Sequence, residues 1–247
     1  MPKLSQVKEA VGIMFSPGGR HAVLRWKPFS VTSFRMLRAL RALGVDPKTV
    51  IDAGANIGQF ARAAAETYPS ARIIAFEPLP DVADTMRANL RDTPRVEVRA
   101  AALGPSDGTI ALRRNRYSPA SSVLRLRSDA ADAFDLAEQG EVEVPLARLD
   151  TALNGEVLET PVLLKLDLQG YELEALRGAS ETLARTQHVL LEIGLQPTYE
   201  EEPTFEDVYA FLTSAGFRFV CPVSILRDDR GRISQMDALF EAADRAS

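Results

Sequence analysis

A regular alternation of strand and helix patterns constrains the fold of this chain more than any other feature. Short apolar runs and helical patterns follow one another through most of the sequence, at residues 49–51, 58–68, 71–76, 80–90, 96–103, 162–168, 171–184, 189–193, 204–216 and 217–222. Elements in this order favour a mostly parallel sheet with helices on both faces. We therefore expect an α/β protein whose ligands bind beyond the carboxyl ends of the strands, where the strand order reverses.

An insertion interrupts this alternation at residues 105–145. Two apolar runs flank a polar loop there, which predicts an added pair of short strands around a loop that covers a site. Tyr117, Ser121 and Ser122 lie in this loop. They either contact a ligand or belong to a flexible polar segment.

The two ends of the chain carry weaker patterns. Residues 1–33 show none that is clear, so we expect an N-terminal extension or cap, followed by one domain over residues 34–247. A last strand at 237–240 follows a turn of Asp and Gly residues, which predicts antiparallel pairing with residues 217–222.

Charge and composition exclude several classes of protein. The net charge of −5 disfavours nucleic acid as a partner, because its phosphates would repel the chain. The arginines between residues 113 and 127 are interpreted as a solvated loop, with substrate contact as the alternative. No uncharged apolar run approaches the roughly 18 residues of a membrane span, and no signal-peptide pattern begins the chain. We expect a cytoplasmic enzyme with no membrane partner, and a homodimer remains an option.

Histidine and cysteine chemistry is not indicated by the sequence. His21 and His188 have no partner at metal-ligand spacing. Cys221 lies in an apolar run, which favours a core residue over a nucleophile. Candidate site residues must therefore be sought among the carboxylates and glycines.

A glycine-containing loop directly after the first strand is the most specific local feature. Asp52 is followed by Gly54, which permits a tight turn and close approach of a ligand, and by Gly58, which lets a helix start near the strand. No Lys-Ser/Thr pair follows the glycines, so the loop is not a P-loop. Asn56 stands where the dinucleotide-binding pattern G-x-G-x-x-G needs its second glycine.

Two acidic residues indicate which ligand this loop prefers. The Asp52 carboxylate is expected beside the loop, where it would repel a pyrophosphate by about 1–4 kcal/mol and attract a sulfonium or ammonium group. Glu77 ends the second strand, a position suited to both hydroxyls of a ribose, and Pro78 fixes the next turn. The pair predicts a cationic nucleoside ligand. The alternative is that Asp52 caps the helix and Glu77 is a solvated strand end.

Four segments resemble the FkbM family of S-adenosylmethionine-dependent methyltransferases. Residues 50–58 are similar to its first motif, and residues 75–78 to its ribose-binding strand end. Residues 96–104 resemble its third strand, which ends near the adenine, and residues 164–172 resemble its downstream motif, with Gly178 at the matching helix position. Gln169 departs from the glutamate that many relatives carry. The resemblance covers about residues 35–240.

This resemblance implies a Rossmann-like class I methyltransferase fold with a seven-stranded sheet and one antiparallel strand. It implies S-adenosylmethionine as donor, S-adenosylhomocysteine as product, and methylation of a hydroxyl oxygen on a sugar, polyketide or similar small molecule. The expected donor-binding residues are Asp52, Gly54, Ala55, Asn56, Gly58, Glu77, Pro78 and Ala102. Two alternatives stay open, an NAD(P)-dependent oxidoreductase and a nucleoside-binding module without catalytic activity.

Candidate catalytic residues lie near the ends of the later strands. Asp167 and Glu192 are candidate general bases, or together hold a divalent metal such as Mg²⁺ that acidifies the acceptor hydroxyl. Lys165 shares a strand face with Asp167 and either pairs with it or contacts substrate. The alternatives are a helix cap for Asp167 and a charged strand end for Glu192. Glu172 and Glu174 are expected in a solvated first helical turn.

Overall fold

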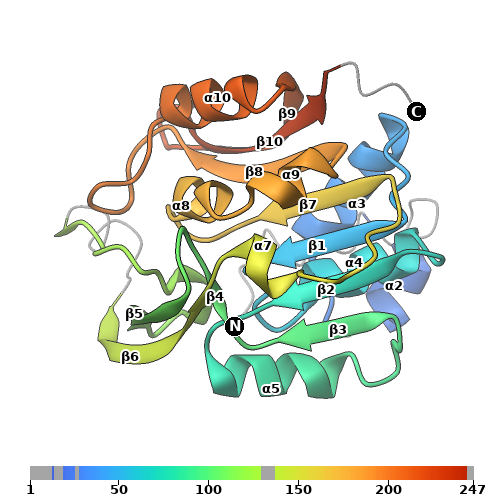
Figure 1. Cartoon of the computed structure of the whole chain (residues 1–247), viewed down its shortest axis with the longest axis horizontal. Helices are drawn as coiled ribbons and strands as arrows, with labels where there is room; N and C mark the ends of the chain where they lie inside the picture. Colours follow the sequence, from blue (N-terminus) through green and yellow to red (C-terminus); the bar gives the residue numbers. More distant parts are fainter. Residues whose placement is uncertain (1–12, 14–18, 26–27, 129–136, 244–247) are drawn as a thin grey trace.

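A seven-stranded sheet forms the centre of the protein (Figure 1). The computed structural model describes residues 13, 19–25, 28–128 and 137–243. The strand order is β3 (Val96–Arg99), β2 (Arg72–Phe76), β1 (Thr49–Ala53), β7 (Val162–Leu166), β8 (His188–Gly194), β10 (Ile233–Ala242) and β9 (Phe217–Arg227). Among these strands only β10 runs in the opposite direction to the other six. The predicted seven-stranded α/β fold, including the antiparallel last strand, is confirmed.

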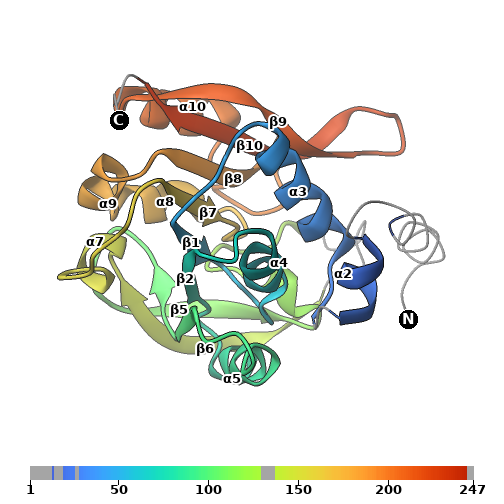
Figure 2. The ribbon, with the colours of Figure 1, turned by 90° about the vertical axis from the view of Figure 1, so that its right-hand side faces the viewer.

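Helices cover both faces of this sheet (Figure 2). One layer contains α3 (Val31–Ala42) and α4 (Gln59–Thr67), and α5 (Pro80–Asn89) lies near the β3 edge. The other layer contains α7 (Leu149–Ala152), α8 (Glu172–Arg177), α9 (Ser180–Ala184) and α10 (Phe205–Ser214). Because side chains alternate along a strand, Val50 joins the α3–α4 core, whereas Ile51 and Ala53 join the opposite core.

The described part of the N-terminal segment packs against the domain. Helix α2 (Gly19–Arg25) occupies a stretch where the sequence showed no regular pattern. Ile13 and Ala22 are buried in the same apolar cluster as α3 and α4. Helix α3 begins at Val31, so the expected boundary between residues 33 and 34 falls inside a helix. The other residues before position 28 lie outside the described part of the chain.

A smaller sheet lies beyond the carboxyl ends of the parallel strands (Figure 1). It contains β4 (Ala102–Leu103), β6 (Glu138–Ala147) and β5 (Gly108–Asn115), in that order. The inserted strand pair is confirmed, but its strands are not short, because β5 and β6 pair from end to end. The single strand expected at 96–103 is wrong, since β3 ends in the main sheet and β4 joins the small one.

The structure also changes the predictions for two of the arginines and for Cys221. Arg113 and Arg114 lie in β5 and not in a loop, and they form ion pairs with Glu141 and Asp81. Cys221 is only partly buried, because it lies on the edge strand β9. Within the described ranges, no helix has the length and apolar character needed to cross a bilayer.

Candidate active site

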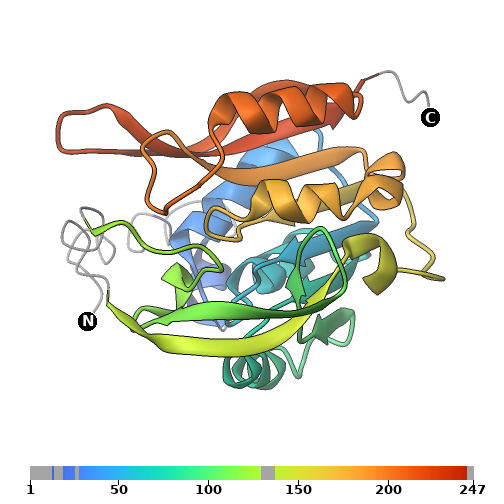
Figure 3. The same cartoon turned by 60° about the vertical axis from the view of Figure 1, so that its left-hand side comes forward.

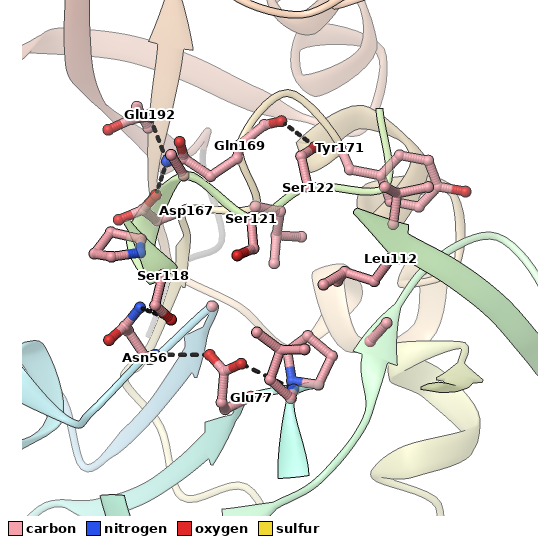
Figure 4. A pocket seen from close by; sticks show the side chains of 18 of the residues that line it. Asn56, Glu77, Leu112, Ser118, Ser121, Ser122, Asp167, Gln169, Tyr171 and Glu192 are labelled. Carbon is pink, nitrogen blue, oxygen red and sulfur yellow. Dashed lines mark hydrogen bonds between the residues drawn. The ribbon is translucent and has the colours of Figure 1, made fainter. Parts of the chain in front are cut away.

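A cavity of about 590 Å³ lies at the carboxyl ends of β1, β2, β7 and β8 (Figure 4). The strand order reverses between β1 and β7, so the cavity is where the fold predicts a ligand. Residues 117–123 of the insertion form part of its wall, and they include the short 3-10 helix η1 (Ser118–Ala120). Its volume is that of a typical site for a small ligand.

Glu77 presents a fixed carboxyl group to this cavity. One of its oxygens accepts a hydrogen bond from the backbone N–H of Asn56 at 3.0 Å, and the other accepts from the N–H of Leu79 at 3.0 Å. Burial raises the pKa of Glu77 to about 7, although these two hydrogen bonds oppose the shift. Glu77 is therefore neither free in solvent nor a simple strand end. Pro78 lines the cavity beside it.

The glycine loop is held against two neighbouring strands. The N–H groups of Gly54 and Ala55 both donate to the Phe76 carbonyl, at 3.0 and 2.9 Å. Gly54 has a φ of +76°, and a Cβ there would lie 1.9 Å from the carbonyl oxygen of Asp167. Only glycine fits this close approach. Asn56, with a φ of +49°, lines the cavity and contacts Ser118 of the insertion.

The structure corrects the role expected for Asp52. Its side chain is fully buried on the α4 face of β1 and does not line the cavity. Lys165, its neighbour on β7, lies 3.2 Å away and sits 5.5 Å from the centre of the Phe60 ring. Burial opposes the charge on Lys165, but the carboxylates of Asp52 and Asp167 raise its pKa above the usual value. Asp52 is thus the counter-ion of an internal lysine.

Three other predicted residues also serve the fold. Lys165 is buried and pairs with Asp167 at 3.4 Å, which is the first of the two roles expected for it. It does not line the cavity, where a substrate contact would place it. Ala55 is buried outside the cavity lining. Gly58 allows close contact between α4 and α5, because a Cβ there would lie 2.7 Å from Leu90. None of the three lines the cavity.

Asp167 and Glu192 do converge, and a side-chain amide lies between them (Figure 4). The Gln169 Nε2 group donates to Asp167 Oδ1 at 2.8 Å and to Glu192 Oε1 at 3.1 Å. The Tyr199 hydroxyl donates to Gln169 Oε1 at 3.0 Å, which turns the amide N–H groups toward the carboxylates. The Ser122 hydroxyl donates to the Gln169 backbone carbonyl at 2.7 Å.

This arrangement does not fit the expected divalent metal. Mg²⁺ needs several converging oxygen ligands, whereas Gln169 directs N–H donors at the space between Asp167 and Glu192. The cationic Lys165 already contacts Asp167. Across the described residues, no group of three or more His, Cys, Asp and Glu side chains could hold a metal ion. We therefore assign no step to a metal.

Glu192 presents a buried carboxyl group with a raised pKa to the cavity. Burial, followed by the nearby carboxyl groups of Asp167, Glu172 and Asp237, raises the pKa of Glu192 well above its usual value. A raised pKa brings a carboxylate closer to the range in which general bases work at neutral pH. Because its side chain lines the cavity, Glu192 is more than a charged strand end.

The prediction of a solvated helical turn is wrong for Glu172. This side chain is buried, and it accepts hydrogen bonds from the N–H groups of Leu168 at 2.6 Å and Gly170 at 3.4 Å. Burial raises its pKa to about 7. Glu172, and not Asp167, therefore fixes the turn after β7. Glu174 is more exposed and pairs with Arg177.

Most of the predicted ligand-facing residues line the cavity, with several more that the sequence did not single out. The predicted ones are Gly54, Asn56, Glu77, Pro78, Ala102, Tyr117, Ser121, Ser122, Asp167 and Glu192. The missed ones include Leu79, Leu103, Leu112, Ser118 and Tyr171, and Gln169 was noted only as a departure from the family motif. The polar composition of the inserted loop was the available signal for Ser118, and the altered motif position was the signal for Gln169. Nothing in the sequence placed Tyr199 beside Gln169.

Comparison with known proteins agrees with this geometry. The sequence matches the Methyltransferase FkbM domain over residues 52–219, which is more than half of the chain. "Methyltransferase 1" of Beauveria bassiana (strain ARSEF 2860) is 33% identical over 150 residues, covering 55% of this chain and 60% of that protein. The "2-O-methyltransferase NoeI" of Sinorhizobium fredii (strain NBRC 101917 / NGR234) is 26% identical over 196 residues, covering 76% and 80%.

A solved structure supports the fold. The crystal structure of PH1948 from Pyrococcus horikoshii matches with a TM-score of 0.50 at 12% identity, over 96% of this chain and 99% of that one. The domain match includes the glycine loop, the Glu77 strand end and the Asp167 segment. The chain therefore belongs to the FkbM family of S-adenosylmethionine-dependent methyltransferases.

Proposed function

We propose that this protein transfers a methyl group from S-adenosylmethionine to a hydroxyl oxygen of a small molecule. The observation that carries the proposal is the Glu77 carboxyl group, which two backbone N–H groups hold in the cavity wall. Each oxygen uses one lone pair for the backbone and keeps another for a hydroxyl donor. Two adjacent acceptors of this kind suit the paired hydroxyls of a ribose. The matched domain supports methyl transfer over hydride transfer.

The rest of the cavity suits the other parts of the donor. Ala102, Leu103 and Leu112 supply apolar surface for an adenine ring. Gly54 leaves room for close approach to the loop, and Asp167 presents a carboxylate to the positive methionine end. The preference for a cationic ligand, assigned to Asp52 from the sequence, is thus carried by Asp167.

Glu192 is the proton acceptor in this proposal. Bound in this cavity, S-adenosylmethionine would supply an activated methyl group, whose transfer forms the O–C bond, breaks the S–C bond and leaves S-adenosylhomocysteine. Glu192 receives the proton that the acceptor hydroxyl loses, and releases it to solvent after the transfer. Gln169 holds Glu192 in place through its amide. The relative NoeI is named a 2-O-methyltransferase, which supports oxygen as the acceptor atom.

Titration calorimetry with S-adenosylmethionine and with NAD tests the donor assignment. We expect the first ligand to bind and NAD to bind much more weakly. Glu77→Gln should weaken S-adenosylmethionine binding by about 10–100-fold, because one amide cannot accept from both backbone N–H groups and both ribose hydroxyls. Glu174→Gln, a change of the same kind on the protein surface, should leave the affinity unchanged. Tighter binding of NAD, or an unaffected Glu77→Gln variant, would overturn the assignment.

Methyl-release assays over a panel of hydroxylated metabolites test turnover. Glu192→Gln should lower kcat by about 100-fold or more while the Kd of S-adenosylmethionine stays near the wild-type value. Activity should persist in EDTA, because no step uses a divalent metal. Donor binding without turnover on any panel member would instead favour the module without catalytic activity.

A further inference from the structure

A second cavity, of about 550 Å³, adjoins the candidate active site. Four residues line both cavities, namely Thr32, Glu192, Leu226 and Gln235, so the two spaces meet at Glu192. The second cavity lies between the first turns of α3 and the β9–β10 hairpin. Of the candidate site residues predicted from the sequence, only Glu192 lines this second cavity.

Three polar side chains form a row along this second cavity. Glu192 on β8 pairs with Asp237 on β10, and Asp237 pairs with Ser224 on β9. Directly paired residues point to the same face of a sheet, and all three line the cavity. The Ser224 hydroxyl hydrogen-bonds to Asp237, whose pKa burial and then Asp167 raise to about 6. The row offers groups that accept and donate hydrogen bonds.

The rest of the lining is mostly apolar. It includes Val31 and Met36 from α3, and Val223, Ile225, Leu226 and Met236 from the hairpin. Ile225 and Leu226 are 42% and 52% exposed, although both are large aliphatic residues. Figure 3 shows the hairpin that carries them extending past the rest of the sheet. Because side chains alternate along a strand, Leu226 points to the same face as Ser224, whereas Ile225 pairs with Met236 and points to the opposite face. An apolar wall beside a polar row is typical of a binding groove.

We infer that the second cavity is the acceptor subsite, and that it takes an uncharged hydroxylated molecule with an apolar face. The inference rests on the proposed function, because Glu192 must receive the acceptor's proton. A molecule in this cavity meets the donor cavity at Glu192, which brings a hydroxyl against the base. Asp237 and Ser224 are positioning residues that bind neighbouring hydroxyls. The apolar face of the molecule packs on Val31 and on Leu226, which lies on the same face of the hairpin as Ser224.

The charge of the row sets the preference for an uncharged molecule. A carboxylate on the acceptor would lie near the carboxyl groups of Glu192 and Asp237, and like charges at short range repel. Arg35 is the basic side chain in the lining, and it already has an interaction partner of its own. The cavity therefore selects against acidic acceptors.

Two probes that differ by one carboxylate test this preference. n-Octyl β-D-glucopyranoside and n-octyl β-D-glucuronide share a sugar ring and an alkyl chain. Their affinities are measured by calorimetry and saturation-transfer NMR on the full chain saturated with S-adenosylhomocysteine. We expect the glucoside to bind at least about tenfold more tightly than the glucuronide. Asp237→Asn should reduce this ratio, a change that a purely structural role for Asp237 would not produce.

A matched pair of valines tests the location. Val31→Asp should weaken glucoside binding by about tenfold, because Val31 lines the second cavity, whereas Val157→Asp, at a valine outside both cavities, should not. Both variants should keep the wild-type affinity for S-adenosylhomocysteine. If that product binds but Val31→Asp leaves glucoside binding unchanged, or the glucuronide binds as tightly as the glucoside, the inference alone fails. If the product does not bind the wild-type protein, the proposed function fails and takes the inference with it.

Discussion

Gln169 donates hydrogen bonds to Asp167 and Glu192, while its own oxygen accepts one from Tyr199. It does so with a φ of +55°, a conformation that residues other than glycine rarely adopt. A cation could join two carboxylates in the same way, but an amide does so without adding charge. The site thus keeps its negative charge for the donor and for the acceptor's proton.

Replacing this amide should create a metal site between Asp167 and Glu192. Gln169→Glu places a third carboxylate between Asp167 and Glu192, so the three repel one another until a divalent ion joins them. We expect calorimetry to show Mn²⁺ binding to the variant and none to the wild type. Methyl transfer without metal should fall by about 10–100-fold.

The control for this variant is a second glutamine that contacts a carboxylate. Gln196 donates to Asp228 at 3.1 Å, and neither residue lines either cavity. Gln196→Glu should therefore bind no Mn²⁺ and keep full activity. Equal Mn²⁺ binding by the wild type and Gln169→Glu would show that the amide does not exclude the ion.

The positions of individual residues also explain which site residues could be predicted from the sequence. Glu77, Asp167 and Glu192 follow from one rule, that carboxyl ends of parallel strands gather at one edge of the sheet. Asp52 obeys that rule in sequence but faces α4, beside Lys165. The pairing of these two residues depends on the register of two strands that lie far apart in the chain. No local pattern reports that register.

At the scale of elements, the approach of the β1 loop to the end of β7 is the tightest feature of the site. Gly54→Ala would bring a methyl group to 1.9 Å from the Asp167 carbonyl oxygen, at a φ of +76°. Gly44 has a similar φ of +84°, but apart from its chain neighbours no described residue lies within 4 Å of the position that an alanine methyl group would take there. Comparing alanine at the two positions therefore separates the steric clash from the backbone strain.

We expect Gly44→Ala to lower the free energy of unfolding by about 1 kcal/mol, from backbone strain alone. Gly54→Ala should lower it by about 2 kcal/mol more, because the loop or β7 must shift. It should also weaken S-adenosylmethionine binding, whereas Gly44→Ala should not. Urea unfolding and calorimetry provide both measurements. Equal stabilities of the two variants would show that the loop accommodates the added methyl group.

Element prediction succeeded where patterns are local and failed where pairing is distant. β1, β2, β7 and β8 are short apolar runs buried between helices, and the sequence places each of them. The division of 96–103 into β3 and β4 arises because β4 pairs with β6, on the far side of the insertion. Helix α2 has no clear hydrophobic periodicity, and it packs on the core through Ala22.

For the whole molecule, several buried carboxyl groups make stability depend on pH. Burial raises the pKa of Glu77 and Glu172 to about 7, and that of Asp237 to about 6. The unfolded chain releases these protons near pH 4, so the folded state binds more protons between about pH 4 and 7. Their contribution to stability is therefore complete below about pH 4 and is lost as pH rises to about 7. His188, whose pKa burial lowers, acts in the opposite direction below about pH 6.5.

Glu172→Gln isolates one of these contributions. The variant keeps a side-chain oxygen that can accept from the Leu168 and Gly170 N–H groups, but it can no longer carry a buried negative charge. We expect it to be more stable than the wild type at about pH 8 by about 1–3 kcal/mol, and the difference to shrink toward about pH 5. Urea unfolding at half-unit pH intervals measures this, with Glu174→Gln on the same helix as the control. Since the wild type and Glu172→Gln share His188 and every other carboxyl group, a constant difference between them across that range would mean that Glu172 titrates no differently in the folded and unfolded chain.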